Sequence, residues 1–244
     1  MSDTDKLLAK IKSRGHWKVV IRPTEYSENL IPSLEDCKRL IEESSVSLRG
    51  WDYPYIDRHG NVGNASANSV HSMCDWDDMS FFEYWRFYKT GQFVHYFSMR
   101  EDWEIDENKK VEIQRNLRTK SDKFLGILST LYSITEIFEF GSRLFTKLEL
   151  VKGVEIIIEL HGVNGRTLFF WDSFMRILYK DYTCVYTDDL AKISLTIPRE
   201  DLIRNSTDLA LRESIKLFRE AFNWSGANEG IFREDQKKLL ERRL

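Results

Sequence analysis

The sequence is poor in the residues that mark linkers, disulfide scaffolds and membrane spans. Four prolines in 244 residues leave little room for flexible linkers. Three cysteines, Cys37, Cys74 and Cys184, lie singly along the chain, so they predict no disulfide framework and no zinc cluster but buried thiols in a reducing cytosol. No apolar run approaches the roughly 18 residues that span a bilayer, and the N-terminus lacks a signal-peptide profile. We therefore expect a soluble, cytoplasmic protein without a membrane partner.

The chain also lacks a strong charge and the common catalytic motifs. Its formal net charge is −3, which argues against the broad basic surface of most nucleic-acid-binding domains. There is no P-loop, no Gly-x-Gly-x-x-Gly, no Gly-x-Ser-x-Gly and no His-Glu-x-x-His. These absences exclude the most familiar nucleotide cradles, nucleophile elbows and zinc sites. We expect no cofactor and no metal.

What remains is an ordinary globular composition, with 42% hydrophobic and 31% charged residues. Strand and helix periodicities mix without a regular strand–helix–strand rhythm, which predicts an α+β fold with a mixed or largely antiparallel sheet. We expect one domain over residues 1–244, with a long central helix near 124–144 and a C-terminal helical pair that could form a subdomain over 199–244. Strands are predicted at 16–22, 46–48, 70–76, 93–99 and 191–197. Further helices are predicted at 3–14, from Ser33, which can act as N-cap with Asp36 three residues on, at 207–222 and at 231–244.

Local patterns predict the structure of five further stretches. Ser80-Phe-Phe-Glu83 matches a capping box, so we predict a helix over 81–89 that ends at Gly91, with a strand as the competing interpretation. Strands at 154–161 and 166–171 flank Gly162-Val-Asn-Gly165, and Asn-Gly between strands predicts a hairpin. Residues 58–68 read as a loop, and residues 102–122 as irregular chain or a surface helix. The long helix could break near residue 133.

Aromatic residues concentrate between residues 46 and 103, which hold 14 of the 32 aromatic residues of the chain. Within this block, Arg49-Gly-Trp-Asp-Tyr-Pro54 predicts a tight turn, because Gly50 permits unusual backbone angles and Pro54 fixes the exit. Arg49 and Asp52 could hold a ligand by hydrogen bonds while Trp51 and Tyr53 stack on it. The alternative is a rigid core plug in which Trp51 is buried and Arg49 pairs with Asp52.

Histidines near this turn complete the candidate site. His59 lies in the polar loop, and His95 lies on a following aromatic strand. We assign them, with Arg49, Trp51, Asp52 and Tyr53, to a ligand- or partner-binding site, and no residue to a catalytic role. His95 is otherwise expected to be a half-buried strand residue.

Two other functions stay open on local patterns. Residues 109–123 contain a basic run that could bind nucleic acid, although interspersed acidic residues make a solvated helix face the competing interpretation. A metal-dependent hydrolase could use His59 and His71 with nearby aspartates, although their spacing matches no known ligand pattern. Glu155 and Glu159 on one strand face, with Asp172 further along, are similar to the acidic sites of metal-dependent nucleases, but the lysine that usually completes such a site is missing from that strand.

Several strings together resemble an uncharacterised family of bacterial cytosolic proteins. They are Ser-Leu-Arg-Gly-Trp-Asp-Tyr-Pro at 47–54, Trp-Arg-Phe-Tyr followed by Gly-Gln-Phe-Val-His-Tyr-Phe at 85–97, and Thr-Glu-Ile-Phe-Glu-Phe at 135–140. The resemblance covers most of the chain and implies a bacterial source and a cytosolic location. It implies no activity, cofactor or site residue.

From the residues we expect a non-catalytic binding or regulatory module that recognises a protein or a small ligand through the 49–53 turn. The abundance of tryptophan, tyrosine and arginine is typical of interfaces, so a protein partner or a second copy of the chain is expected. A nucleic-acid-binding protein is the first alternative, and a metal-dependent enzyme is the second.

Overall fold

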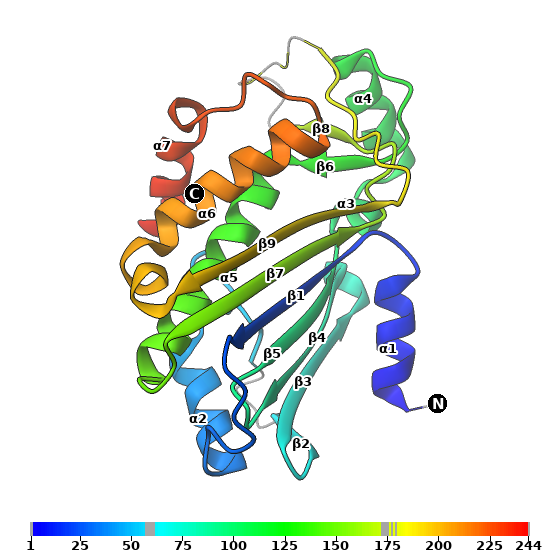
Figure 1. Cartoon of the computed structure of the whole chain (residues 1–244). Coiled ribbons are helices and arrows are strands. Elements are labelled where there is room, and N and C mark those ends of the chain that lie inside the picture. The colour runs from blue at the N-terminus through cyan, green and yellow to red at the C-terminus, as the bar shows by residue number, and fades with distance from the viewer. Residues whose placement is uncertain (1, 57–61, 172–175, 177, 179, 244) are drawn as a thin grey trace.

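An antiparallel sheet runs through the computed structural model (Figure 1). The structure describes residues 2–56, 62–171, 176, 178 and 180–243. Over these residues the sheet has seven strands in the order β2-β3-β4-β5-β1-β7-β9, and each neighbouring pair is antiparallel. In that order the strands are Gly63–Ser66, Ser69–Trp76, Phe81–Tyr88, Phe93–Ser98, His16–Pro23, Gly153–His161 and Leu190–Pro198. A short parallel pair, β6 (Phe124–Gly126) and β8 (Thr167–Phe169), lies beside it.

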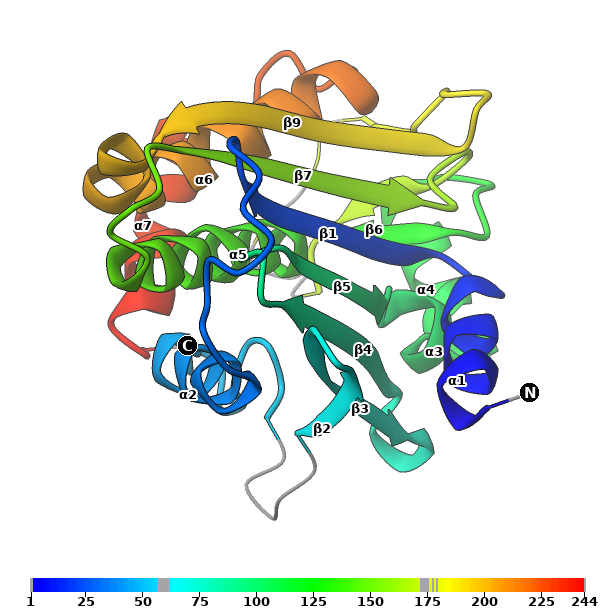
Figure 2. The ribbon, with the colours of Figure 1, turned by 60° about the horizontal axis from the view of Figure 1, so that its bottom comes forward.

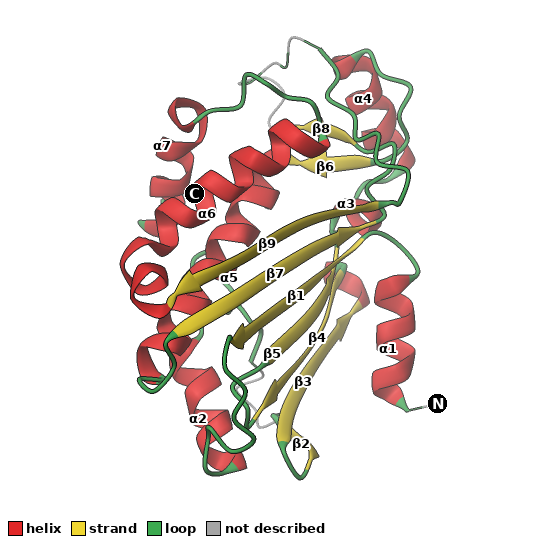
Figure 3. Cartoon of the chain, in the orientation of Figure 1, coloured by secondary structure: helices red, strands yellow, loops and turns green. Residues whose placement is uncertain are grey.

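Helices cover the two faces of the sheet unequally, as Figure 2 shows. One face carries α2 (Leu34–Ser44), the long α5 (Ile127–Lys147) and α6 (Arg199–Ala221), with α7 (Glu229–Leu240) packed on α5 and α6. On the other face, α1 (Asp3–Lys12) packs over β4 and β5. Short α3 (Glu101–Glu104), α4 (Glu107–Leu117) and the 3-10 turn η1 (Asp77–Met79) connect the strands. Figure 3 separates these helices from the strands by colour, and the predicted α+β class is confirmed.

The sequence pattern explains the central strands. Along β7, Val154, Ile156, Ile158 and Leu160 are fully buried in the main core, and they alternate with partly exposed residues. Since β7 lies between β1 and β9, this alternation fixes which face of the sheet meets the helices. The predicted N-cap of α2 is also confirmed, because the Ser33 side chain accepts a hydrogen bond from the Asp36 amide.

The predicted helix over 81–89 is wrong, because this segment is strand β4. Ser80 adopts a left-handed backbone (φ 51°) rather than capping a helix, and β4 pairs with β3 and β5. Trp85 and Phe87 enter the main core, whereas Phe82 and Tyr84 pack under α1. A strand that is buried on both faces needs no alternation of polar and apolar residues, so the capping-box pattern misled the prediction.

The predicted hairpin at residues 162–165 is also wrong. The strand before the turn, β7, pairs with β1 and β9, whereas the strand after it, β8, pairs with β6. Arg166 accounts for the redirection: its buried guanidinium donates to the Gly162 carbonyl (2.6 Å), the Phe124 carbonyl (2.8 Å) and the Asp102 carboxylate (2.5 and 2.7 Å). These bonds hold the chain after the turn against β6 instead of β7.

Smaller differences concern single elements. Part of the predicted loop at 58–68 is strand β2, and residues 57–61 lie outside the described part of the chain. The predicted strand at 46–48 is a single bridge from Val46 to Tyr53. Helix α5 continues without a break through residue 133, and α4 occupies the middle of the 102–122 stretch. Among the described helices, none is long and apolar enough to cross a membrane.

Candidate functional site at the 49–53 turn

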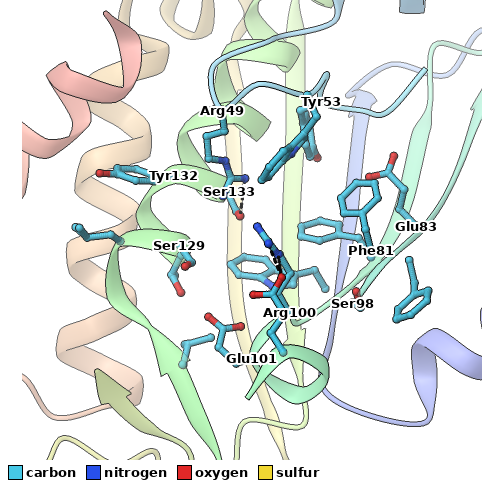
Figure 4. Close-up of a pocket in the computed structure, with 18 of the residues that line it drawn as sticks. Arg49, Tyr53, Phe81, Glu83, Ser98, Arg100, Glu101, Ser129, Tyr132 and Ser133 are labelled. Atoms are coloured by element: carbon cyan, nitrogen blue, oxygen red, sulfur yellow. Dashed lines mark hydrogen bonds and ion pairs between the residues drawn. The ribbon is translucent and has the colours of Figure 1, made fainter. Parts of the chain in front are cut away.

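A cleft of about 760 Å³ opens where β5 ends and α5 begins (Figure 4). Its walls come from the 49–53 turn, the start of β4, the end of β5, α3 and the first two turns of α5. These segments are far apart in sequence and meet only in the folded chain. The volume is in the range of small-molecule sites.

The 49–53 turn is closed by two backbone hydrogen bonds. The Val46 amide donates to the Tyr53 carbonyl (2.9 Å), and the Tyr53 amide donates to the Val46 carbonyl (2.7 Å). Gly50 has a φ of +91°, a backbone conformation that costs other residues energy. The closed loop therefore presents Arg49, Trp51 and Asp52 along one edge of the cleft.

Arg49 joins this turn to α5. Its guanidinium makes two hydrogen bonds to the Glu136 carboxylate (3.1 and 2.5 Å) and one to the Ser133 hydroxyl (3.3 Å). Glu136 is fully buried, and burial raises its pKa while the Arg49 charge opposes that rise. The pair is therefore a buried, bidentate ion pair whose carboxylate depends on Arg49 for its charge.

A second buried network lies beneath the turn. The Tyr53 hydroxyl is 3.2 Å from Nδ1 of His95, and Nε2 of His95 is 3.6 Å from the Glu83 carboxylate. Glu83 also accepts a hydrogen bond from the Tyr55 amide (2.7 Å). All three side chains are at most 5% exposed, and burial raises the pKa of Tyr53 well above its ordinary value, so its phenol stays protonated. The network ties the turn to β4 and β5.

Trp51 faces two cations. The Arg49 guanidinium lies 5.4 Å and the Arg100 guanidinium 5.1 Å from its ring centroid, both within cation–π range. Arg100 is paired with Glu104 on α3, and Figure 4 shows the two arginines entering the cleft from opposite sides. The ring centroids of Phe81 and Trp51 are 6.2 Å apart, so this wall of the cleft is largely aromatic.

The opposite wall carries hydroxyl groups from one face of α5. Ser129, Tyr132 and Ser133 recur at helical spacing and line the cleft together with Thr130. Glu101 lies at the foot of this wall, where its carboxylate accepts a hydrogen bond from the Gly126 amide (2.9 Å). Burial raises the pKa of Glu101. The cleft thus has one aromatic and one hydroxyl-rich wall.

Five of the six predicted site residues line this one cleft. These are Arg49, Trp51, Asp52, Tyr53 and His95. His59 lies outside the described residues. The core-plug alternative is correct in one respect, since an Arg–carboxylate pair locks the turn, but the partner is Glu136 rather than Asp52.

Sequence reasoning missed the acidic residues and the second arginine of the site. Glu136 lies on the apolar stripe of α5. A charged residue in such a stripe indicates a buried ion pair, so the sequence did contain a signal for Glu136. Glu83, Arg100 and Glu101 gave no comparable signal. Glu83 lay in the segment predicted to be a helix, and Arg100 and Glu101 lay between the predicted strand at 93–99 and the 102–122 stretch.

The described residues behind the two alternative functions do not line this cleft, and several of them are paired, whereas His59 and Asp172 lie outside the described residues. In the basic run, Lys109 pairs with Glu112 and Lys110 with Glu107, both on α4. Of the acidic groups, Asp75 and Asp77 share Lys10. Glu155 pairs with Arg22, and Glu159 pairs with Lys18. Within the described ranges, no group of three or more metal-ligating side chains is close enough to hold an ion.

Comparison of the chain with protein-family models, curated proteins and solved structures finds no match.

Proposed function

We propose that this chain is a non-catalytic binding module and that its cleft at the 49–53 turn takes a small organic ligand. The supporting observation is that five residues singled out for stacking and hydrogen bonding line one cleft of ligand size. An aromatic wall faces a hydroxyl-rich wall across that space. A flat ligand with one polar edge would satisfy both walls.

The protonation of the site supports binding rather than chemistry. Tyr53, His95 and Glu83 could form an acid–base chain, but they are buried and contact one another. Because the Tyr53 phenol stays protonated, it offers no nucleophile. The Glu136 carboxylate forms an ion pair with Arg49, so it is not available to act as a base.

A cytosolic location is part of the same proposal. Cys37, Cys74 and Cys184 form no disulfide within the described residues, and all three are buried. Burial raises the pKa of Cys37 to about 11 and raises that of Cys184 as well, so these two thiols are poorly reactive. Unpaired cysteines are expected in a reducing compartment.

The test is to fill the cleft. Ser129 is partly exposed and lines the cleft, so the ring introduced by Ser129→Phe should occupy it. The control variant Ser225→Phe introduces the same ring at an exposed position away from the cleft. A library of aromatic fragments would be screened by saturation-transfer NMR against the native protein and both variants. We expect fragments that bind the native protein and Ser225→Phe but lose binding to Ser129→Phe. Absence of any binder to the native protein, or equal binding to a folded Ser129→Phe variant, would contradict the proposal.

A further inference from the structure

The N-terminus of α5, like those of α3, α6 and α7, has no side-chain hydrogen bond at its N-cap, whereas three other helices do. Helices α1, α2 and α4 begin with a side chain, Ser2, Ser33 or Asp106, that accepts a hydrogen bond from a first-turn amide. Helix α5 begins at Gly126 with no such bond and has no acidic residue in its first turn. It is 21 residues long, and this uncapped end lies beside the cleft. Its free amides and dipole favour a negative charge there.

Thr130, one turn into α5, has an unused hydroxyl. Its side chain is 1% exposed and lines the cleft, and its Oγ1 has no hydrogen-bond partner within the described structure. Two other threonines of the same helix behave differently: Thr135 and Thr146 each donate to the carbonyl four residues earlier, at 2.8 Å. A buried hydroxyl without a partner costs free energy, so its presence is a sign of a missing partner.

Ser129 and Arg100 supply further donors around the same point. The Ser129 hydroxyl accepts from the Trp171 indole (3.2 Å), which leaves its own proton to be donated. The Arg100 guanidinium reaches the cleft from the opposite side and pairs with one oxygen of Glu104. Backbone amides, two hydroxyls and a guanidinium therefore surround this end of the cleft.

The acidic groups that line this part of the cleft are Glu104, which is paired with Arg100, and Glu101. The Glu101 carboxylate takes the amide of Gly126, which precedes the first turn of α5. Because burial favours the neutral form of Glu101, its repulsion of an incoming anion is reduced.

We infer that the ligand carries an oxyanion, a carboxylate or a phosphate, which sits at the N-terminus of α5 and accepts from Thr130 and Ser129. Its flat apolar part lies along the aromatic wall of Trp51 and Phe81. The inference rests on the proposed function, since it assigns the polar end of the same cleft.

Three small probes test the oxyanion directly. Benzoate carries a carboxylate, phenyl phosphate carries a phosphate, and benzamide is the neutral counterpart of benzoate. Titrations followed by NMR should show that at least one anion binds at least ten-fold more tightly than benzamide, in line with charge-assisted hydrogen bonds. The stronger anion identifies the ligand group. Equal binding of all three, lost in Ser129→Phe, would overturn the oxyanion and leave the binding cleft in place.

Thr130→Val separates a ligand role from a structural one. The valine keeps the shape but removes the unpaired hydroxyl, so the melting temperature should rise by roughly 2–4 °C while affinity for the preferred anion falls about ten-fold. Thr135→Val is the matched control: it removes bonds to Leu131 and Gln236, so it should lower the melting temperature. A Thr130→Val variant that is less stable, or that binds the anion as tightly as the native protein, would overturn the inference. Failure of both anions to bind would overturn it too, while the fragment screen still decides the proposed function.

Discussion

Arg49 holds the cleft together at the scale of single residues. It lies on the turn that forms one edge, bonds to Glu136 and Ser133 on α5, and contacts Trp51. A fully buried carboxylate is costly without a counter-charge, so the turn and the helix depend on this guanidinium for their alignment. Arg49 therefore has a structural role as well as a place in the proposed site.

Removal of Arg49 should be costly and pH-dependent. Arg49→Met leaves the Glu136 carboxylate buried and unpaired, which is expected to lower the free energy of unfolding by about 3–5 kcal/mol near neutral pH. Burial raises the pKa of Glu136, and the variant lacks the Arg49 charge that opposes this rise. The folded variant therefore favours the protonated carboxyl, and the deficit should shrink as pH falls and grow as pH rises through the raised pKa. Urea denaturation between pH 5 and pH 8 measures this.

The double variant Arg49→Met with Glu136→Gln is the control for that measurement. It removes the charge together with its partner, so it should be more stable than Arg49→Met alone and should lose most of the pH dependence. If the single variant is as stable as the native protein at pH 8, Glu136 does not depend on Arg49.

At the scale of elements, local sequence patterns predicted helices and strands correctly where tertiary contacts favour the same structure. The cap at Ser33 and the strand at 154–161 were predicted correctly, because the residues that make the local pattern also make the contacts. The capping-box pattern before β4 predicted a helix wrongly, because the segment pairs with β3 and β5 and is buried in the sheet. The Asn-Gly turn failed because Arg166 selects β6 as the partner of the following strand, through contacts that no local pattern contains.

Two glycines of that turn should respond differently to alanine. Gly162 and Gly165 have similar positive φ angles, +76° and +74°, so both should lose about 1–2 kcal/mol of stability from the backbone alone. A Cβ at Gly162 would also lie 2.9 Å from the Cα of Gly15, whereas nothing lies within 4 Å of one at Gly165. Gly162→Ala should therefore be less stable than Gly165→Ala by at least about 1 kcal/mol in chemical denaturation. Equal losses would show that the contact with Gly15 adjusts freely.

At the scale of the whole molecule, the cleft is a product of tertiary structure. The 49–53 turn and His95 could be nominated from sequence, because aromatic residues, glycine and charge lie close together there. The facing wall could not be predicted from sequence, since Ser129 and Thr130 belong to an apolar helix pattern. They line the same cleft as the turn only because α5 packs on the sheet. Both walls are needed before the cleft suggests a ligand.

The binding of benzoate, mapped by NMR, shows whether the cleft at the 49–53 turn is the ligand site. Backbone amide and tryptophan indole shifts would be followed as benzoate is added to the native protein. We expect the largest changes on the first turn of α5, on Arg100 and on the Trp51 indole, and we expect them to disappear in Ser129→Phe but to persist in Ser225→Phe. Changes centred on the basic α4, or no saturable change at all, would contradict the claim that this cleft is the binding site.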